Sequence, residues 1–119
     1  MSALCHGQIV WVEIPDSQGR NPKDRLAVVI LSSDASPSDA EVWVVGISTD
    51  IGAARSSDQV FLPWDAQGHP TTGLRQECSA VCTWMHKVPV TKIRRTAGMV
   101  RGRQLIEIMR KIGELPPAP

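Results

Sequence analysis

The stretch Arg25-Leu26-Ala27-Val28-Val29-Ile30-Leu31-Ser32 decides the fold of this chain. It is a short run of apolar, mostly branched side chains that opens on an arginine and closes on the polar residues 32–34. A run of this kind, bounded by turn-forming residues, predicts a β-strand that is buried on both faces. Arg25 then lies at the mouth of the best-buried strand, where a rigid backbone holds its guanidinium toward solvent or a cleft. Such a placement suits the recognition of a phosphate.

Other predicted strands lie on both sides of this stretch. Residues 7–14 and 41–48 are rich in β-branched and aromatic side chains, which predicts a strand before and a strand after it. Turn-rich loops at residues 15–22 and 33–40 make the connections, and the first is long enough to project as a flap. The remaining segments predict a small-residue loop at 51–58, strands at 59–62, 77–87 and 94–98, a polar loop at 65–72 and a helical turn at 90–93.

The C-terminal segment carries the clearest helical pattern. Its apolar residues recur at a spacing of three and four and predict one inward-facing stripe, formed by Leu105, Ile108, Met109 and Ile112. Gly113 is a candidate C-cap, and the prolines at 116 and 117 prevent continuation of the helix. The sum is a mainly β (α+β) fold, a small barrel or partly open sheet of strongly curved antiparallel strands with a C-terminal helix. We expect a single domain over residues 1–115 and a flexible tail over 116–119.

Composition bounds the class of protein. The chain has 119 residues, 42% of them hydrophobic, and a formal net charge of +1, which fits one domain with one core. The sequence contains no run of eighteen apolar residues, so we expect no membrane span. It also has no charged segment followed by an apolar run at its start, so we expect no secretory signal. The three cysteines therefore indicate free thiols in a reducing, cytoplasmic compartment.

The C-terminal third is basic. Its cations are accompanied by few acids and are Lys87, Lys92, Arg94, Arg95, Arg101, Arg103, Arg110 and Lys111. This pattern is a weak electrostatic indication of a polyanionic partner. The alternative is an ordinary solvated helix face.

The cysteines, histidines and tryptophans suggest mainly structural roles. Cys78 and Cys82 have no second ligand pair at metal-binding spacing, so we expect small core residues and no metal or cofactor. On one face of their strand we place Cys78, Ala80, Cys82 and Trp84, and on the other Ser79, Val81 and Thr83. A Cys82–His86 nucleophile pair is conceivable, but nothing in the sequence provides an oxyanion hole.

Two of the four tryptophans, Trp11 and Trp43, lie inside predicted strands and are expected in the core. Trp64 follows a proline in a loop, where it is expected to be partly exposed and able to stack a base or line a subunit interface. His69 lies in another loop position and is either a proton carrier or a residue that holds the loop.

One constellation can carry chemistry. If the strand opened by Arg25 pairs antiparallel with residues 41–48, the start of one lies beside the end of the other. A guanidinium then meets the hydroxyls of Ser48 and Thr49, a set that can stabilise and orient a phosphodiester. The alternative is that Arg25 pairs with Asp24, Asp50 or Glu13 while the two hydroxyls make turn hydrogen bonds.

The order of several short motifs resembles the PemK/MazF family of bacterial toxins. The segments that carry the resemblance are Gly7-Gln8-Ile9-Val10-Trp11-Val12, a loop with Gly19, the stretch from Arg25 to Ser32, Val44-Val45-Gly46-Ile47-Ser48-Thr49, Val60-Phe61-Leu62-Pro63, Thr72-Gly73-Leu74, Cys78-Ser79-Ala80-Val81 and Gly98-Met99-Val100. They extend over nearly the whole chain, and their order and spacing are more specific than any one of them.

The resemblance implies an SH3-like, CcdB–PemK-like barrel that works as a homodimer. It implies a toxin of a toxin–antitoxin pair, a metal-independent and sequence-selective endoribonuclease that cleaves single-stranded mRNA and is neutralised by an antitoxin protein. In such enzymes the 2′-hydroxyl attacks the adjacent phosphate, which gives a cyclic phosphate and a 5′-hydroxyl.

The functional residues of the family match few positions of this sequence. The arginine that opens the second strand falls on Arg25, as acid and charge stabiliser, and the hydroxyl that ends the third strand falls on Ser48, with Thr49 beside it. Asp24, Asp50 and His69 are the candidates for a general base. Candidate RNA-binding residues are Asn21, Lys23, Asp50, Arg55, Trp64 and His69.

Three positions depart from the family pattern. Leu26 replaces the usual proline, Ser48 replaces threonine, and Asn21 stands near the place of the flap acid, with Asp24 the nearest carboxylate. An alternative to the nuclease is therefore a binding module that keeps the fold without cleavage, acting on a protein partner, as a DNA-gyrase poison, or by RNA binding alone.

Overall fold

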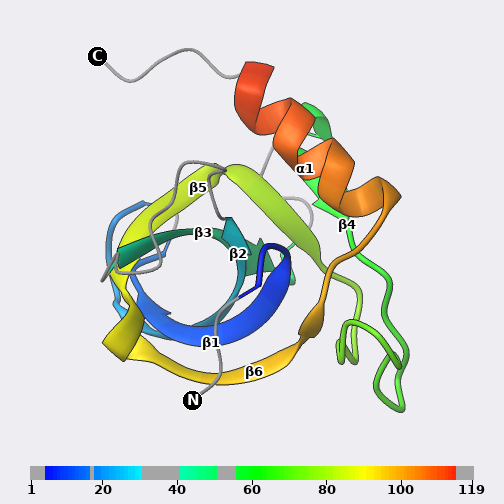
Figure 1. The fold of residues 1–119 in the computed structure, drawn as a ribbon, viewed down its shortest axis with the longest axis horizontal. Coiled ribbons are helices and arrows are strands. Elements are labelled where there is room, and N and C mark those ends of the chain that lie inside the picture. The colour runs from blue at the N-terminus through cyan, green and yellow to red at the C-terminus, as the bar shows by residue number, and fades with distance from the viewer. Residues whose placement is uncertain (1–4, 17, 31–40, 51–55, 115–119) are drawn as a thin grey trace.

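A single strongly curled antiparallel sheet forms most of the molecule. The computed structural model describes residues 5–16, 18–30, 41–50 and 56–114. In chain order its elements are β1 (Gln8–Ile14), β2 (Lys23–Ile30), β3 (Glu41–Ser48), the 3₁₀ turn η1 (Ser56–Asp58), β4 (Gln59–Phe61), β5 (Ser79–Pro89), the 3₁₀ turn η2 (Val90–Lys92), β6 (Ile93–Met99) and α1 (Arg103–Glu114). The strand order is β4-β5-β3-β2-β1-β6, so the sheet curls into an open barrel with β4 and β6 at its edges (Figure 1). The mainly β fold with a C-terminal helix is confirmed.

Two apolar clusters occupy the two faces of the curled sheet. The concave interior holds Val10, Val12 and Ile14 of β1 with side chains of β2, β3 and β5. The outer face of the same strands packs against Leu105, Ile108 and Ile112 of α1, which lies outside the barrel (Figure 1). The central strand β2 alternates between the two clusters, with Ala27 and Val29 inside and Val28 and Ile30 outside. Burial on both faces explains its continuous apolar run.

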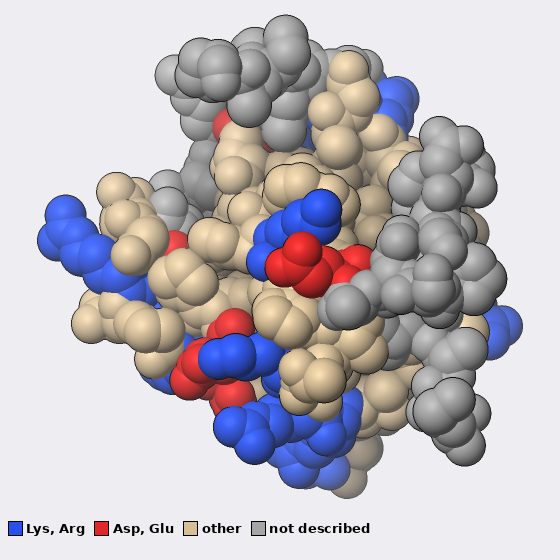
Figure 2. All heavy atoms as spheres, turned by 60° about the vertical axis from the view of Figure 1, so that its left-hand side comes forward, with Lys and Arg blue, Asp and Glu red and all other residues tan. Residues whose placement is uncertain are grey.

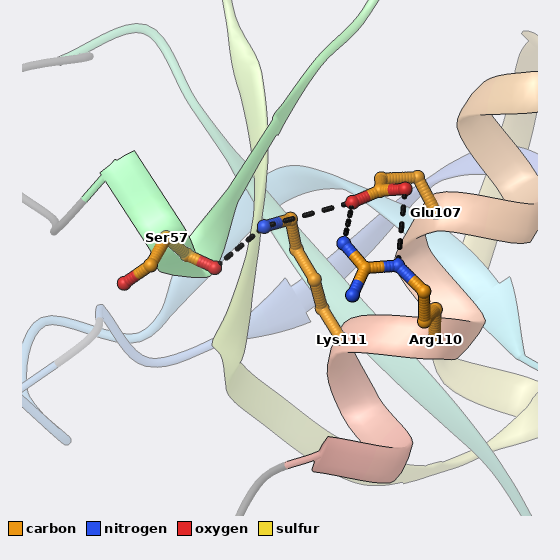
Figure 3. Close-up of polar contacts among 4 residues, drawn as sticks. All are labelled: Ser57, Glu107, Arg110 and Lys111. Carbon is orange, nitrogen blue, oxygen red and sulfur yellow. Dashed lines mark hydrogen bonds and ion pairs between the residues drawn. The ribbon is translucent and has the colours of Figure 1, made fainter.

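The helix is fixed at its C-terminal end by a small polar cluster. Lys111 donates from its ammonium group to the carbonyl oxygen of Ser57 in η1, at 2.7 Å, and lies 3.7 Å from the carboxylate of Glu107 (Figure 3). Arg110 also contacts this carboxylate from the next turn (Figure 3). The cluster ties α1 to the segment that precedes the edge strand β4.

Several sequence-based predictions of side-chain burial are wrong. Trp43 is 46% exposed, because α1, which covers part of the outer face, packs mainly against β4 and β5. Trp11 is half-buried rather than in the core, and Met109 is 36% exposed at the edge of the helical stripe. Gly113 lies within α1 and does not cap it.

Element bounds also differ at several ends. The strand β2 begins at Lys23, two residues before the predicted start, and the predicted end at Leu31 and Ser32 lies outside the described residues. The strand β5 runs two residues later than predicted at each end. The expected loops at 33–40 and 51–55 and the tail at 116–119 also lie outside the described residues.

A large β-bulge overturns the predicted faces of β5. The register between β3 and β5 passes from Val45 opposite Met85 to Ile47 opposite Ala80, so Gly46 lies opposite residues 81–84 of the continuous strand β5. The bulge shifts the alternation of side chains by one residue. Cys78, Ala80 and Cys82 stay on the outer cluster as predicted, whereas Trp84 turns into the barrel interior.

Gly46 makes this position of Trp84 possible. A Cβ atom at residue 46 would lie 2.2 Å from the indole ring of Trp84. The ring therefore packs directly on the backbone of β3, a close approach that any larger residue prevents.

We expect Gly46→Ala to lower the free energy of unfolding by about 1–3 kcal/mol, because overpacking displaces a buried ring or the backbone. Gly113→Ala is the matched control, since residue 113 is helical with open space around it and alanine favours the helix. Urea denaturation of both variants measures the difference. Equal stability of the two variants would contradict the packing of Trp84 on Gly46.

Candidate functional site

A pocket at one end of the barrel gathers the residues singled out at the ends of β2 and β3. It has a volume of about 760 Å³, and the candidate residues that line it are Lys23, Asp24, Arg25, Ser48, Thr49 and Asp50. The strands β2 and β3 pair antiparallel as expected, with Ala27 opposite Gly46. Arg25 precedes that pair by two residues and Ser48 follows it by two, so the sheet brings the start of β2 beside the end of β3.

The guanidinium of Arg25 is held by backbone carbonyl groups. Its Nε donates to the carbonyl oxygen of Ile14 at 3.2 Å, and one terminal nitrogen donates to the carbonyl oxygen of Asn21 at 2.8 Å. Its central carbon lies 5.9 Å from the ring centroid of Trp84, within range of a cation–π contact. Among the described residues it forms no ion pair with Asp24, Asp50 or Glu13, which excludes those expected pairings there.

The loop between β1 and β2 owes its shape to one carboxylate. Oδ1 of Asp16 accepts hydrogen bonds from the backbone N–H groups of Gln18 and Arg20, both at 2.9 Å, and its Oδ2 accepts from the amide of Asn21 at 3.3 Å. Asn21 itself adopts a left-handed backbone, with φ of 51°. This turn aims the carbonyl group of Asn21 at Arg25, so Asp16 positions the arginine without touching it.

Trp84 joins this loop to the barrel interior. Its indole N–H donates to the carbonyl oxygen of Pro15 at 3.0 Å, while its ring packs on Gly46 and faces Arg25. The same side chain therefore fixes the first residue of the loop, the end of β3 and the arginine head.

The hydroxyl of Ser48 makes a local turn. It accepts from the backbone N–H of Asp50 at 3.0 Å and lies 3.4 Å from the carbonyl oxygen of the same residue. The predicted turn hydrogen bonding is thus present for Ser48, and Thr49 and Asp50 are exposed beside it. A ligand bound in this pocket can contact the hydroxyl of Ser48, the exposed carboxylate of Asp50 and the guanidinium of Arg25.

The other RNA-binding candidates divide into two groups. Asn21 supports Arg25 through its carbonyl group, and Lys23 and Asp50 line the pocket. Trp64 is 47% exposed, as expected, but neither Trp64 nor His69 lines the pocket, and Arg55 lies outside the described residues.

His69 holds its loop. Its Nδ1 accepts hydrogen bonds from the backbone N–H groups of Thr71 and Thr72, at 3.1 and 3.2 Å. Its carbonyl oxygen accepts from Gly73 at 2.8 Å, and the loop docks on β6 where the N–H of Met99 donates to the carbonyl of Thr71. Of the two roles open from the sequence, the geometry favours the structural one.

Several pocket residues were missed by sequence reasoning. Arg75, Gln76 and Arg95 line the pocket, as do Trp11, which was expected in the core, and Trp84, which was assigned only to a strand face. Arg95 belongs to the basic set of the C-terminal third, and among the described residues it is the member of that set that reaches the pocket.

Several other cations of the basic set contact acidic side chains. Lys92 pairs with Glu13 at 3.1 Å, and Arg94 lies 3.9 Å from Asp24. Figure 2 shows cationic and anionic side chains next to one another on the face it displays. Such exposed pairs contribute little to stability, and they reduce any long-range attraction for a polyanion.

The described residues contain neither a membrane-spanning type of helix nor a group of metal ligands. No described helix has the length and apolar character needed to cross a membrane. In the same part of the chain, no three His, Cys, Asp or Glu side chains gather as they would around a metal ion.

Comparison with known proteins establishes the family. The profile described as "PemK-like, MazF-like toxin of type II toxin-antitoxin system" matches residues 6–115, so the chain belongs to this family of toxins. Comparison with curated protein sequences gives no significant match.

Solved structures of the family share the fold. The Mycobacterium tuberculosis toxin MazF-mt6 is 21% identical, with 89% of this chain and 93% of that chain covered and a TM-score of 0.64. MazF (Form-I) from Deinococcus radiodurans is 16% identical, with 95% and 96% covered and a TM-score of 0.72. An endoribonuclease in complex with its cognate antitoxin from a Mycobacterial species is 12% identical, with 97% and 100% covered and a TM-score of 0.70.

The buried thiols give a test of the core around the pocket. Burial, reinforced by the charge of Glu77, raises the pKa of Cys78 to about 11, and burial also raises the pKa of Cys82 to about 11. Both groups are therefore protonated near neutrality, which argues against the Cys82–His86 nucleophile pair.

Cys5 is exposed. We expect one fast-reacting thiol at pH 8 in a colorimetric thiol assay of the native protein, lost in Cys5→Ser; fast reaction of that variant would contradict the burial of Cys78 and Cys82.

The loop carboxylate gives a test in acid. Hydrogen bonds, first from the backbone N–H of Arg20, hold the pKa of Asp16 below its ordinary value of 3.8. A lowered pKa in the folded state stabilises the fold above pH 3.8, and this contribution is lost as the pH falls through the lower folded value. We expect thermal melts between pH 6 and pH 2 to show a steeper loss of stability for wild type than for Asp16→Asn. Parallel curves would show that this carboxylate does not stabilise the loop in its charged form.

Proposed function

We propose that this toxin is an endoribonuclease that cleaves single-stranded RNA without a metal ion. The observation that carries the proposal is the pocket shared by Arg25, Ser48 and Thr49 at the barrel end. Enzymes of the PemK/MazF family, to which the chain belongs, are endoribonucleases in general. In this proposal the family's arginine corresponds to Arg25 and its hydroxyl to Ser48, with Thr49 beside it.

The proposed reaction is transfer of a phosphodiester within the RNA chain. The 2′-hydroxyl gives up its proton to a base and attacks the adjacent phosphorus, and the bond to the 5′-oxygen of the next nucleotide breaks. That oxygen takes up a proton, for which Arg25 is the proposed donor, and the products are a 2′,3′-cyclic phosphate and a 5′-hydroxyl. Negative charge grows on the non-bridging oxygens as the attack proceeds. A guanidinium fixed by two carbonyl groups needs little reorganisation to stabilise that charge.

Ser48 and Thr49 serve as phosphate-orienting hydroxyls in this proposal. The turn between Ser48 and Asp50 keeps the serine side chain in a defined position at the pocket wall. Asp24 and Asp50, which also line the pocket, are the candidates for the base that receives the 2′-hydroxyl proton. His69 drops out of that set because it does not line the pocket and its Nδ1 accepts two backbone hydrogen bonds within its own loop.

We also propose that the toxin acts as a homodimer in the cytoplasm and is neutralised by a cognate antitoxin. One similar structure is an endoribonuclease from a Mycobacterial species in complex with its cognate antitoxin. Another is MazE-MazF (Form-II) from Deinococcus radiodurans. Exposed large apolar side chains, namely Phe61, Trp64, Ile106 and Met109, offer surface for protein partners here.

We expect Arg25→Ala to slow cleavage of single-stranded RNA at least about a hundredfold, the scale for removing one transition-state donor. The measurement is a cleavage time course in EDTA with mapping of both new ends. Arg103→Ala is the matched control, since it removes the same charge from an exposed position at the start of α1, outside the pocket. Thermal melts of both variants verify folding.

The result decides between the nuclease and a binding module. If Arg25→Ala cleaved RNA at the same rate as wild type, Arg25 would have no role in the reaction. Absence of cleavage by wild type on any RNA, with growth arrest on expression, would favour the module that acts by binding alone.

A further inference from the structure

The pocket extends beyond the proposed phosphate site to a second wall that the reaction does not use. This wall carries Trp11, Arg75, Gln76 and Arg95. Trp11 on β1 and Arg95 on β6 are cross-strand partners, and the guanidinium carbon of Arg95 lies 5.2 Å from the ring centroid of Trp11. An aromatic face and a planar guanidinium are therefore stacked on each other at the edge of the pocket.

The chemistry of this wall matches a nucleobase. Unpaired RNA bases stack on aromatic rings and on guanidinium planes, and their edges accept and donate hydrogen bonds. Arg75 and Gln76 are exposed and follow Leu74, whose carbonyl oxygen accepts from the N–H groups of Asp65 and His69. The loop is thus anchored, and its two polar side chains can contact a base edge.

The register places Trp11 in the neighbouring strand, next to the position that pairs with Arg25. On β1 and β2, Trp11 lies opposite Leu26 and Val12 lies opposite Arg25. Successive side chains of a strand point to opposite faces, so Arg25 and Trp11 start from opposite faces of the sheet, and both line the same pocket. A phosphate at Arg25 and a base that reaches over Leu26 to Trp11 can therefore belong to neighbouring parts of the same RNA chain.

Charge and volume fit the same occupant. Cationic side chains at residues 23, 25, 75 and 95 exceed the two carboxylates of Asp24 and Asp50 along the pocket, and Arg94 lies 3.9 Å from that of Asp24. A volume of about 760 Å³ is typical of sites for small organic ligands.

We propose that Trp11 and Arg95 form a base-stacking subsite that binds the nucleobase next to the phosphate at Arg25 and contributes to sequence selectivity. The subsite rests on the proposed RNA-cleaving function and assigns base recognition to this wall. The exposed Trp64 and the loop residue His69, candidates from the sequence, do not line the pocket.

Binding of an uncleavable RNA tests the subsite separately from the reaction. The probe is a set of short 2′-O-methyl oligoribonucleotides of varied sequence, which lack the attacking hydroxyl, titrated by fluorescence anisotropy. We expect Trp11→Ala and Arg95→Ala each to weaken binding about tenfold or more, the scale of one lost stacking contact. Trp11→Phe retains an aromatic face and is expected to recover most of the affinity.

Two matched controls remove the same residue types outside the pocket. Trp43→Ala deletes a tryptophan that is 46% exposed, and Arg103→Ala deletes an exposed arginine at the start of α1. Both are expected to bind within about twofold of wild type, since neither lines the pocket. Arg95 is exposed, so its variant keeps the test valid if Trp11→Ala does not fold.

The outcomes separate the subsite from the nuclease. Unchanged binding by Arg95→Ala and Trp11→Ala, or losses equal to those of the two controls, would overturn the subsite even if RNA is cleaved. Selective loss supports the subsite even if wild type cleaves nothing, and in that case the nuclease proposal alone fails. Where cleavage occurs, we expect the subsite variants to raise KM and relax the preference for one base beside the cut, with kcat retained.

Discussion

The hydrogen bonds from Arg25 to two backbone carbonyl groups are the constraint around which the pocket is built. A guanidinium held by carboxylates would have its charge compensated, whereas carbonyl groups orient the fork and leave the charge intact. The two carbonyls belong to the end of β1 and to the loop that follows it. The arginine therefore depends on a loop conformation that is set by Asp16, Asn21 and the pairing of β1 with β2.

Trp84 connects this pocket to the core of the barrel. The ring fills part of the interior beside Val44 and Val88, its N–H binds the start of the loop, and its face meets Arg25. It can occupy this place because β5 bulges opposite Gly46 and residue 46 has no side chain. Packing inside the barrel and geometry at the pocket are thus not independent, since one indole contributes to both.

The sequence allowed prediction of those features that depend on local pattern. Apolar, β-branched runs bounded by turn residues indicated the strands. The hypothesis that β2 and β3 are antiparallel neighbours, joined by the predicted loop at 33–40, brought Arg25 and Ser48 together. Trp84 could not be placed, because the bulge in β5 breaks the two-residue alternation on which face assignment rests. The stacking of Arg95 on Trp11 was also out of reach, since it depends on β1 pairing with a strand far away in the chain. Trp43 shows the same limit: a tryptophan within a strand is buried only where another layer covers it.

The charge distribution constrains how such a protein can recognise RNA. With a net charge of +1 and exposed cations paired with acids, the surface offers little of the long-range attraction that strongly basic nucleic-acid-binding proteins use. Affinity from released counterions grows with the number of phosphates that are contacted. In this chain the cations that line the pocket are few, so binding of RNA would depend more on stacking and on hydrogen bonds to base edges. Stacking is available to every base, whereas the hydrogen-bonding groups on the edges differ from base to base. A protein with few cations for the phosphates depends more on those edges, and selectivity for sequence follows from that dependence.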